Sequence, residues 1–308
     1  MPIQAARVPA KERRAWDGPE RSPAQERFYR ELMTAQKLPS PPEVAQRMLV
    51  AVNREEARVQ DLAKLIARDQ SLTAGLLRLA NSAFFALRSK VTSIQQAVTL
   101  LGFTRVRDLV LGLSIWNSLD GKDPAGRRHR KRMWTHTATV AAAAKLRRRA
   151  AEDERTGGDG GAAFAAGLLH DVGKLIIGLR LGASYWSLLE EAAANGQTAA
   201  EIEEATFGCH HGLVGGWLLQ IWQLPPTLVE PVALHHDPLD AAFGMDLTSV
   251  VAVADRLIDA TDPESGVARE DVLSEVRAFA PGLLGTEEWR DMYANVAREE
   301  KAVSGIFD

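Results

Sequence analysis

The sequence predicts an all-α protein with two lobes, an N-terminal helical bundle and a larger C-terminal helical domain. Apolar residues recur at helical spacing along the chain, and Leu72, Leu76 and Leu79, for example, fall on one face of a helix. No useful length of chain alternates apolar and polar residues at a period of two, so we expect no sheet. Hydrophobic residues make up 46% of the chain, which suffices for a real core. The length of 308 residues is enough for two domains.

The N-terminal lobe is expected over residues 26–119, behind a flexible tail at 1–25 in which Pro, Arg, Glu and Ala follow no period. Pro42 suits the first turn of a helix that follows an extended prolyl turn. Apolar residues at helical spacing place the helices of this lobe near the segments 42–52, 62–66, 71–81, 94–101 and 106–116.

The ends of two of these helices carry local signals. Ser93 and Gln96 have the spacing of a capping box, which would start the helix at residue 94. Gly102 is expected to stop that helix, because glycine tolerates the backbone conformation found just beyond a helix C-terminus. Thr104 is expected to cap the helix that follows.

The second lobe is expected over residues 120–308, and the loop at 121–126 marks the boundary because glycine, proline and aspartate break the helical pattern there. A polar, glycine-rich loop is expected at 152–161. The helical segments of this lobe are expected at 127–151, 162–179, 183–194, 199–207, 213–222, 227–234, 247–260, 269–279 and 286–303.

Composition limits the classes of function. The net charge of −3 and the pI of about 6.2 argue against binding a polyanion through bulk charge. Cys209 is the only cysteine, which excludes an internal disulfide framework and fits a reducing compartment. Charged residues interrupt each apolar run before it reaches membrane-spanning length, and the N-terminus lacks the apolar stretch of a secretory signal. We therefore expect a soluble, cytoplasmic protein with no membrane partner.

Six of the seven histidines fall at four places in the second lobe that also carry carboxylates or a lysine. Imidazole and carboxylate are ligands of borderline metals such as zinc, iron and manganese. These histidines and the carboxylates that accompany them are His136, His170, Asp171, His210, His211, His235, His236 and Asp255. Taken together, the set predicts a metal site.

The segment His-Asp-Val-Gly-Lys at residues 170–174 carries the most chemistry. On a helix, Lys174 lies three residues from Asp171 and four from His170, so the side chains share one face. A carboxylate such as Asp171 can bridge metal ions, and an ammonium can hold a phosphate oxygen. Because the flanking residues are apolar, an unpaired Asp171 would be costly, and its partner is either a metal cation or a basic side chain such as Lys174.

Each of the other residues has a simpler explanation when it is taken alone. A single histidine such as His136 can be a satisfied core residue. The pair His235 and His236, at an expected helix end, can complement the helix dipole. Asp255 lies in an apolar helix with Arg256 as its only obvious basic neighbour. It is the occurrence of all these residues in one chain, in this order, that favours a metal site.

The order of these residues resembles that of the HD superfamily of metal-dependent phosphohydrolases, in which one or two divalent metals activate water for attack on a phosphate ester. The resemblance implies iron or manganese, with zinc as the alternative. In this role Asp171 would hold or bridge the metals, Lys174 would contact the phosphate, and His236 would be a ligand or an acid/base residue. The implied metal ligands are His136, His170, Asp171, His211, His235, His236 and Asp255.

The middle histidine of the set could be His210 or His211. The HD superfamily places this histidine four residues before a glycine, which favours His211 because Gly215 follows it at that distance. Small residues at Gly212 and Gly215 also permit close helix packing.

The N-terminal half resembles the HDOD domain, a bacterial, all-helical family associated with signal transduction. The resemblance covers about residues 30–236 and rests on the segments 38–44 (LPSPPEV), 68–72 (RDQSL), 77–84 (LRLANSAF) and 91–102 (VTSIQQAVTLLG). It implies a regulatory protein that senses a nucleotide or phosphate ligand, engages a signalling partner protein, or does both. The alternative is an active phosphohydrolase, because many family members lack the metal ligands that this chain keeps.

Three features bear on neighbouring functions. Relatives that hydrolyse cyclic di-GMP continue the histidine pair with Glu and a Gly-Tyr-Pro signature, whereas Asp237 and Pro238 follow it here. The basic segments 127–132 and 145–149 could contact nucleic acid, but a solvated helix face balanced by the acidic residues that follow is favoured. The helices around Gly102 could mimic a helix-turn-helix, although ordinary packing is favoured. We do not expect a nucleic-acid partner.

Overall fold

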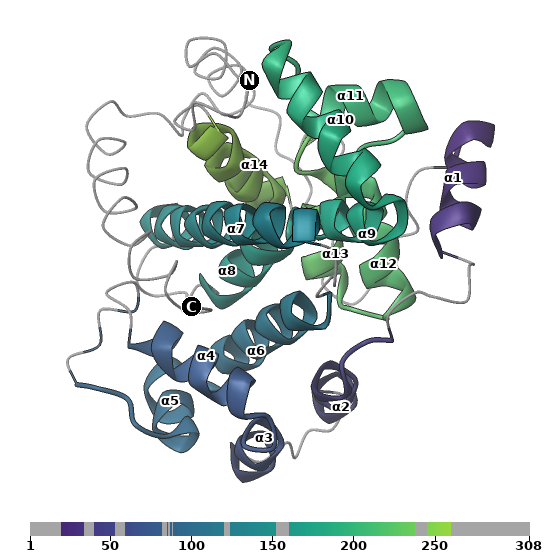
Figure 1. The fold of residues 1–308 in the computed structure, drawn as a ribbon. Helices are drawn as coiled ribbons and strands as arrows, with labels where there is room; N and C mark the ends of the chain where they lie inside the picture. The colour runs from purple at the N-terminus through teal and green to yellow at the C-terminus, as the bar shows by residue number, and fades with distance from the viewer. Residues whose placement is uncertain are drawn as a thin grey trace, which may run out of the picture.

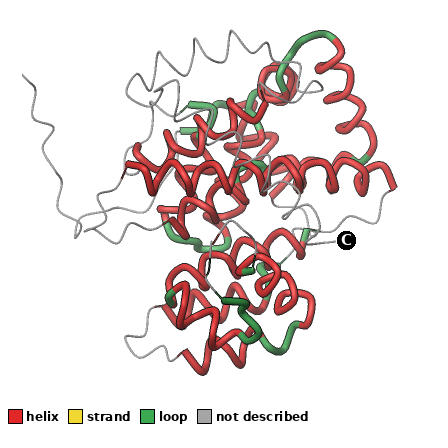
Figure 2. Tube along the Cα trace, turned by 90° about the vertical axis from the view of Figure 1, so that its left-hand side faces the viewer, coloured by secondary structure: helices red, strands yellow, loops and turns green. Residues whose placement is uncertain are grey.

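The fold is built from α-helices, without a strand, in the part of the chain that the structure describes (Figures 1 and 2). This computed structural model describes residues 20–33, 40–52, 59–81, 85, 87, 89–119, 124–151, 160–237 and 245–259. The helices are α1 (Pro23–Met33), α2 (Glu43–Val52), α3 (Val59–Ile66), α4 (Gln70–Ala80), α5 (Ile94–Leu101), α6 (Phe103–Ser118), α7 (Pro124–Ala151), α8 (Gly160–Leu169), α9 (Val172–Leu181), α10 (Ala183–Ala194), α11 (Ala199–Phe207), α12 (His211–Ile221), α13 (Pro226–Leu234) and α14 (Met245–Asp259). The predicted all-α class is confirmed.

Helices α2 to α6 form a group at the bottom of Figure 1, and α7 to α14 form the group above it. Within the lower group, α6 packs against α2, α4 and α5. Helix α6 also packs against α8 of the upper group, so closely that a Cβ at Gly112 would lie 2.9 Å from Leu168 Cδ2. Buried apolar residues of both groups therefore belong to one continuous core. Helix α1 packs against α9 and α11, where Phe28 stacks on Phe207 with ring centroids 4.6 Å apart.

The junction between α5 and α6 differs in part from the prediction. Ser93 caps α5 as predicted, because its Oγ accepts a hydrogen bond from the N–H of Gln96 at 3.1 Å. Gly102 ends α5 as predicted, with a positive φ of 89° that favours glycine. Helix α6 begins directly after Gly102, so Thr104 lies inside it, and the prediction that Thr104 caps this helix is wrong. One glycine turns the chain and leaves no further non-helical residue to act as a cap.

The apolar stretch that the sequence predicted as one helix is broken at His170 and Asp171. Helix α8 ends at Leu169, α9 begins at Val172, and the two residues between them form a turn. Asp171 occupies the N-cap position of α9, where its backbone oxygen accepts a hydrogen bond from the N–H of Lys174 at 2.9 Å. Its side chain makes no capping hydrogen bond. The turn therefore presents the carboxylate to a site between helices instead of using it to cap α9.

The same stretch, Gly161–Leu181, is long and apolar enough to cross a membrane, but 83% of its most apolar window is buried inside the protein. Helix α8 packs against α6, α7, α13 and α14, and α9 packs against α12. This burial is consistent with the core of a soluble protein.

The remaining helix bounds follow the predictions closely. Helices α10 and α11 have the predicted bounds, and α12 to α14 each begin one or two residues earlier than predicted. Helix α7 begins at Pro124, inside the loop predicted at 121–126, because proline suits the first turn of a helix. The helices predicted at 269–279 and 286–303 lie outside the described residues, as do residues 1–19 of the predicted tail.

Candidate metal centre

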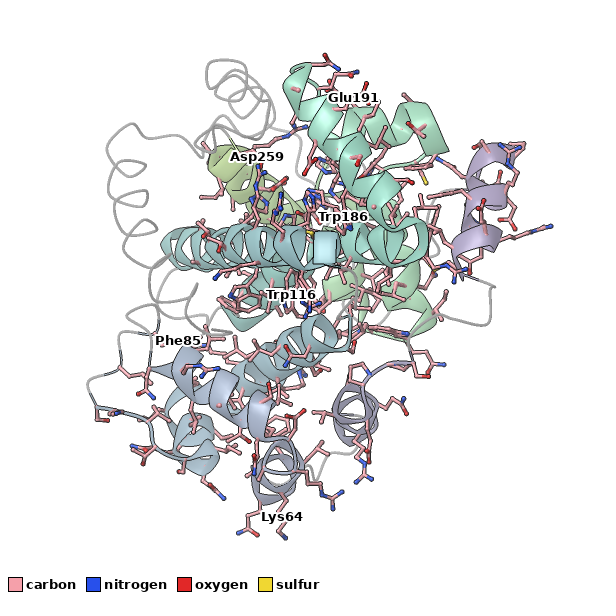
Figure 3. All side chains as sticks on the ribbon, in the orientation of Figure 1. Lys64, Phe85, Trp116, Trp186, Glu191 and Asp259 are labelled. Carbon is pink, nitrogen blue, oxygen red and sulfur yellow. The ribbon has the colours of Figure 1, made fainter. Side chains whose placement is uncertain are left out.

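The seven side chains predicted as metal ligands converge where α7, α9, α12, α13 and α14 meet. His136 comes from α7, and Asp255 comes from α14. The others are His170 and Asp171 in the turn before α9, His211 at the start of α12, and His235 and His236 directly after α13. In Figure 3, nitrogen-bearing side chains gather between the labelled Trp186 and Asp259. Side chains that are far apart in the sequence are thus brought to one place.

A first group of ligand atoms is formed by His136, His170 and Asp255. Asp255 Oδ1 lies 3.0 Å from His136 Nε2 and 3.2 Å from His170 Nε2, and the two nitrogens are 3.3 Å apart. His170 and Asp255 are buried, and His136 is partly buried. Two imidazoles and one carboxylate therefore face a single point, as the donors of a metal position do.

A second group is formed by His211, His235 and His236. His211 Nε2 lies 3.3 Å from His235 Nε2 and 2.9 Å from His236 Nε2. Asp171 lies between the two groups, because its Oδ1 is 2.9 Å from His211 Nε2 and 3.5 Å from His170 Nε2. That oxygen is buried and has no hydrogen-bond partner among the described residues. A carboxylate in this position can contact an ion in each group.

The hydrogen bonds of the histidine rings fix which nitrogen faces the site. His170 Nδ1 donates to the carbonyl oxygen of Gly167 at 2.6 Å, and His235 Nδ1 donates to that of Val232 at 2.8 Å. Because a carbonyl oxygen only accepts, the Nε2 atom of each neutral ring carries a lone pair. These lone pairs point at neighbouring nitrogens and carboxylate oxygens, an arrangement whose repulsion a proton or a metal cation would relieve. The donor set thus suits a divalent metal.

Electrostatics within the site agree with this assignment. Burial alone raises the pKa of Asp171, but Lys174 and the neighbouring histidines outweigh it and hold that pKa well below its ordinary value. Burial and the charges of nearby histidines hold the pKa values of His235 and His236 well below the ordinary value, so these rings stay neutral. Burial lowers the pKa of His136, but its neighbouring carboxylates outweigh burial and raise it to about 9. A proton on His136 therefore competes with a metal ion for the first group.

Glu203 is a part of the site that sequence reasoning missed. This fully buried residue of α11 accepts hydrogen bonds at Oε2 from His211 Nδ1 at 2.7 Å and from the His211 backbone N–H at 2.6 Å. Burial raises the pKa of Glu203, but His211 outweighs it and holds the pKa below its ordinary value. The only signal in the sequence was an acidic residue in the middle of the predicted helix 199–207. That signal does not indicate that Glu203 contacts His211.

A pocket of about 150 Å³ opens beside the ligand atoms. The pocket is lined in part by Asp171 and Lys174, and Lys174 Nζ lies 2.8 Å from Asp171 Oδ2. Trp186 of α10 and Asp259 of α14 also line it, and Asp259 Oδ1 lies 3.7 Å from His136 Nδ1. Burial and the charge of Asp255 raise the pKa of Asp259 to about 6. Sequence reasoning missed Asp259 as well, although it follows Asp255 by one helical turn.

His210 belongs to neither group of ligand atoms, although its ring centroid lies 5.1 Å from that of His236. Its Nε2 lies 3.0 Å from Asp237 Oδ2, beyond the end of α13. The Nε2 of His211, by contrast, faces Asp171 and the two other histidines of the second group, His235 and His236. The geometry therefore favours His211 over His210, in agreement with the spacing to Gly215.

The helical fold and the two groups of donor atoms, joined by Asp171, define an all-α protein with a candidate metal centre. Residues 38–238 match the HDOD domain family. This match covers more than half of the chain, and the chain belongs to the HDOD family.

Two solved structures are similar over nearly the whole chain. An HDOD domain protein of unknown function from Geobacter sulfurreducens is 25% identical, with a TM-score of 0.71 over 92% of this chain and 98% of that one. A candidate phosphohydrolase from Shewanella amazonensis is 23% identical, with a TM-score of 0.69 over 93% of this chain and 99% of that one. The second likeness shows the fold alone.

An uncharacterized protein of Treponema pallidum is 24% identical over 216 residues, which are 70% of this chain and 41% of that protein. The protein YuxH of Bacillus subtilis is 34% identical over 67 residues, which are 22% of this chain and 16% of that protein. This chain thus spans less than half the length of the curated relatives it matches.

Proposed function

We propose that this protein is a metal-dependent phosphohydrolase that cleaves a phosphate ester at a two-metal site. The observation that carries the proposal is the position of Asp171, between two groups of histidine nitrogens and beside Lys174 at the wall of an open pocket. Bound divalent ions supply Lewis acidity, which lowers the pKa of water and neutralises phosphate charge. We propose iron or manganese, with zinc as the alternative, because imidazole and carboxylate donors suit these metals.

Asp171, Lys174 and His236 are proposed to have different roles in this reaction. Asp171 lies within reach of both groups of donors and would contribute its carboxylate to holding the ions. Burial lowers the pKa of Lys174, but the surrounding carboxylates outweigh it and raise that pKa, so the ammonium stays charged and can hold a phosphate oxygen. His236 is proposed to be a ligand and not an acid/base residue, because its Nε2 faces His211 Nε2 within the second group.

The part of the pocket lined by α10 and the start of α11 would hold the organic half of the ester. Trp186, Leu189 and Ala193 offer apolar surface there, and Gln197 and Thr198 offer an amide and a hydroxyl. A pocket of about 150 Å³ suits a group of modest size, such as one base or sugar of a nucleotide. We therefore propose a nucleotide or another small phosphate ester as the substrate.

The experiment that tests this function is a hydrolysis screen with defined metal content. Protein purified without chelator is analysed for metals, reconstituted with Fe(II), Mn(II) or Zn(II), and assayed on p-nitrophenyl phosphate, nucleoside monophosphates and cyclic nucleotides. We expect phosphate release that requires the metal and stops on addition of EDTA. An absence of turnover across the panel, with two ions per chain measured in the same sample, would overturn the hydrolase proposal.

Lys174→Gln is expected to lower turnover about 100-fold or more while leaving metal content unchanged, because the change removes a cation at the phosphate and no proposed ligand. The measurement is kcat on the best substrate of the screen, together with metal analysis of the same sample. Lys64→Gln is the matched control, because Lys64 is exposed on α3, far from the site (Figure 3). Equal turnover in Lys174→Gln and Lys64→Gln would remove Lys174 from the mechanism.

A second candidate function is regulatory: metal or ligand binding would set a conformation that a signalling partner protein reads. The observation that favours it is the close contact between Leu168, two residues before His170, and Gly112 of α6. A shift at His170 would reach the lower group of helices through this contact. Proteins captured from a bacterial cytoplasmic extract should then differ between metal-loaded and EDTA-treated protein, and identical capture would count against this candidate.

A further inference from the structure

Glu203 stands out as a buried carboxylate whose hydrogen bonds converge on one histidine. Its side chain is fully buried, and its Oε2 accepts from both the backbone N–H and the Nδ1–H of His211. Its Oε1 accepts from the hydroxyl of Tyr185 on α10 at 2.5 Å. Tyr185 is itself fully buried. Three short hydrogen bonds thus hold the carboxylate in a single orientation behind the ring of His211.

Burying a carboxylate is costly unless hydrogen bonds and charges compensate for it. Among the described residues Glu203 forms no salt bridge with Lys or Arg, and its closest nitrogen partner is His211 Nδ1, at 2.7 Å. The hydrogen bonds from His211 and Tyr185, with the charge of Lys174 nearby, therefore compensate for its burial.

The acceptor behind His211 also differs in kind from those behind two other histidines of the site. His170 and His235 donate Nδ1–H to neutral backbone carbonyls, whereas His211 donates to a carboxylate. An anionic acceptor fixes the ring in the tautomer with a lone pair on Nε2 and makes that nitrogen a stronger metal donor. That Nε2 faces the other two histidines of the second group, His235 and His236.

We propose that Glu203, held by Tyr185, is a positioning residue that orients His211 and sets the metal affinity of the second group. The inference rests on the two-metal site of the proposed function, but it concerns metal binding and does not require turnover. Loss of the charge on Glu203 should weaken the ion held by the second group about 10- to 100-fold and leave the first ion in place. In the described part of the chain, Glu203 shares no hydrogen bond or ion pair with His136, His170 or Asp255, which form the first group and keep their own hydrogen bonds.

The test is a metal titration of Glu203→Gln. The amide oxygen can keep both hydrogen bonds from His211 while the amide nitrogen donates to Tyr185, so the variant removes the charge and preserves the shape. Wild-type protein and variant are stripped with EDTA and titrated with Mn(II) and with Co(II), with calorimetry and the Co(II) absorption spectrum as readouts. We expect two binding steps in both proteins, with only one step weakened in Glu203→Gln. Unfolding in denaturant reports separately on stability.

Glu204→Gln is the matched control, since Glu204 is the next residue of α11 and is exposed. If Glu203→Gln does not fold, Tyr185→Phe is decisive, because it removes one hydroxyl from Glu203 and should weaken the same step less strongly. Binding steps equal to those of wild type in the folded variant would overturn the proposal, as would equal weakening of both steps. Two ions in wild-type protein without any phosphatase activity would defeat the proposed hydrolase while leaving the role of Glu203 intact.

Discussion

Asp171→Asn is expected to empty both metal positions, so that elemental analysis finds background metal in the variant and two ions in the wild-type protein. The physical reason is the location of the carboxylate between the two histidine groups, within 3.5 Å of His170 Nε2 and 2.9 Å of His211 Nε2. Asparagine has nearly the same shape but carries no charge, so it cannot neutralise two adjacent cations. Phosphate release should fall with the metal.

Thermal unfolding gives an independent readout of the same change. A metal that binds only the folded state at 1,000 times its Kd adds about 4 kcal/mol of stability. We expect the Tm of the wild-type protein to be higher with Mn(II) than with EDTA. The Tm of Asp171→Asn should be the same in both conditions. An Asp171→Asn protein that still holds two ions would contradict a bridging role for Asp171.

Asp108→Asn controls for the loss of a buried carboxylate as such. Asp108 is 1% exposed on α6, outside the site, and pairs with Arg107 at 2.7 Å. Its replacement should lower the free energy of unfolding without changing metal content. The comparison separates damage to the fold from damage to the metal site.

Local sequence rules predicted most helices because each helix carries its own signals. Helix α11 is an example: it has the predicted bounds 199–207, and the structure shows why, since Thr198 and Glu201 form a complete capping box and Gly208 ends the helix in a left-handed conformation. The break at His170 and Asp171 was missed, because small apolar residues on both sides favour a continuous helix. In the fold α8 packs against α6 and α9 packs against α12, contacts that the local sequence does not encode.

The residues of the candidate site also fall into those that the sequence predicts and those that it does not. The histidines, Asp171 and Asp255 could be predicted because residue type and order carry their chemistry. Glu203 and Tyr185 could not, because each is an ordinary helical residue until the fold brings Tyr185 of α10 and Glu203 of α11 to His211 of α12. Their role arises from contacts between helices, and no spacing in the sequence encodes those contacts.

Gly173→Ala is expected to destabilise the protein by about 3 kcal/mol and to disturb metal binding as well. A Cβ at Gly173 would lie 1.9 Å from the backbone oxygen of His211 and 2.8 Å from the backbone nitrogen of Gly215. Backbone atoms of α12 cannot move aside by a change of rotamer, so α9 and α12 must separate. That separation also draws Asp171, two residues away, from His211. Urea unfolding in EDTA measures the loss of stability, and metal titration measures the loss of the site.

Gly112→Ala shows that the effect of Gly173→Ala belongs to one helix contact and not to glycine replacement in general. A Cβ at Gly112 would lie 2.9 Å from Leu168 Cδ2, the end of a side chain that can adjust. Alanine also favours the helical state over glycine by about 1 kcal/mol. We therefore expect unfolding free energy within about 1 kcal/mol of wild type and unchanged metal content. If Gly112→Ala and Gly173→Ala behave alike, the α9–α12 backbone contact does not set the geometry of the site.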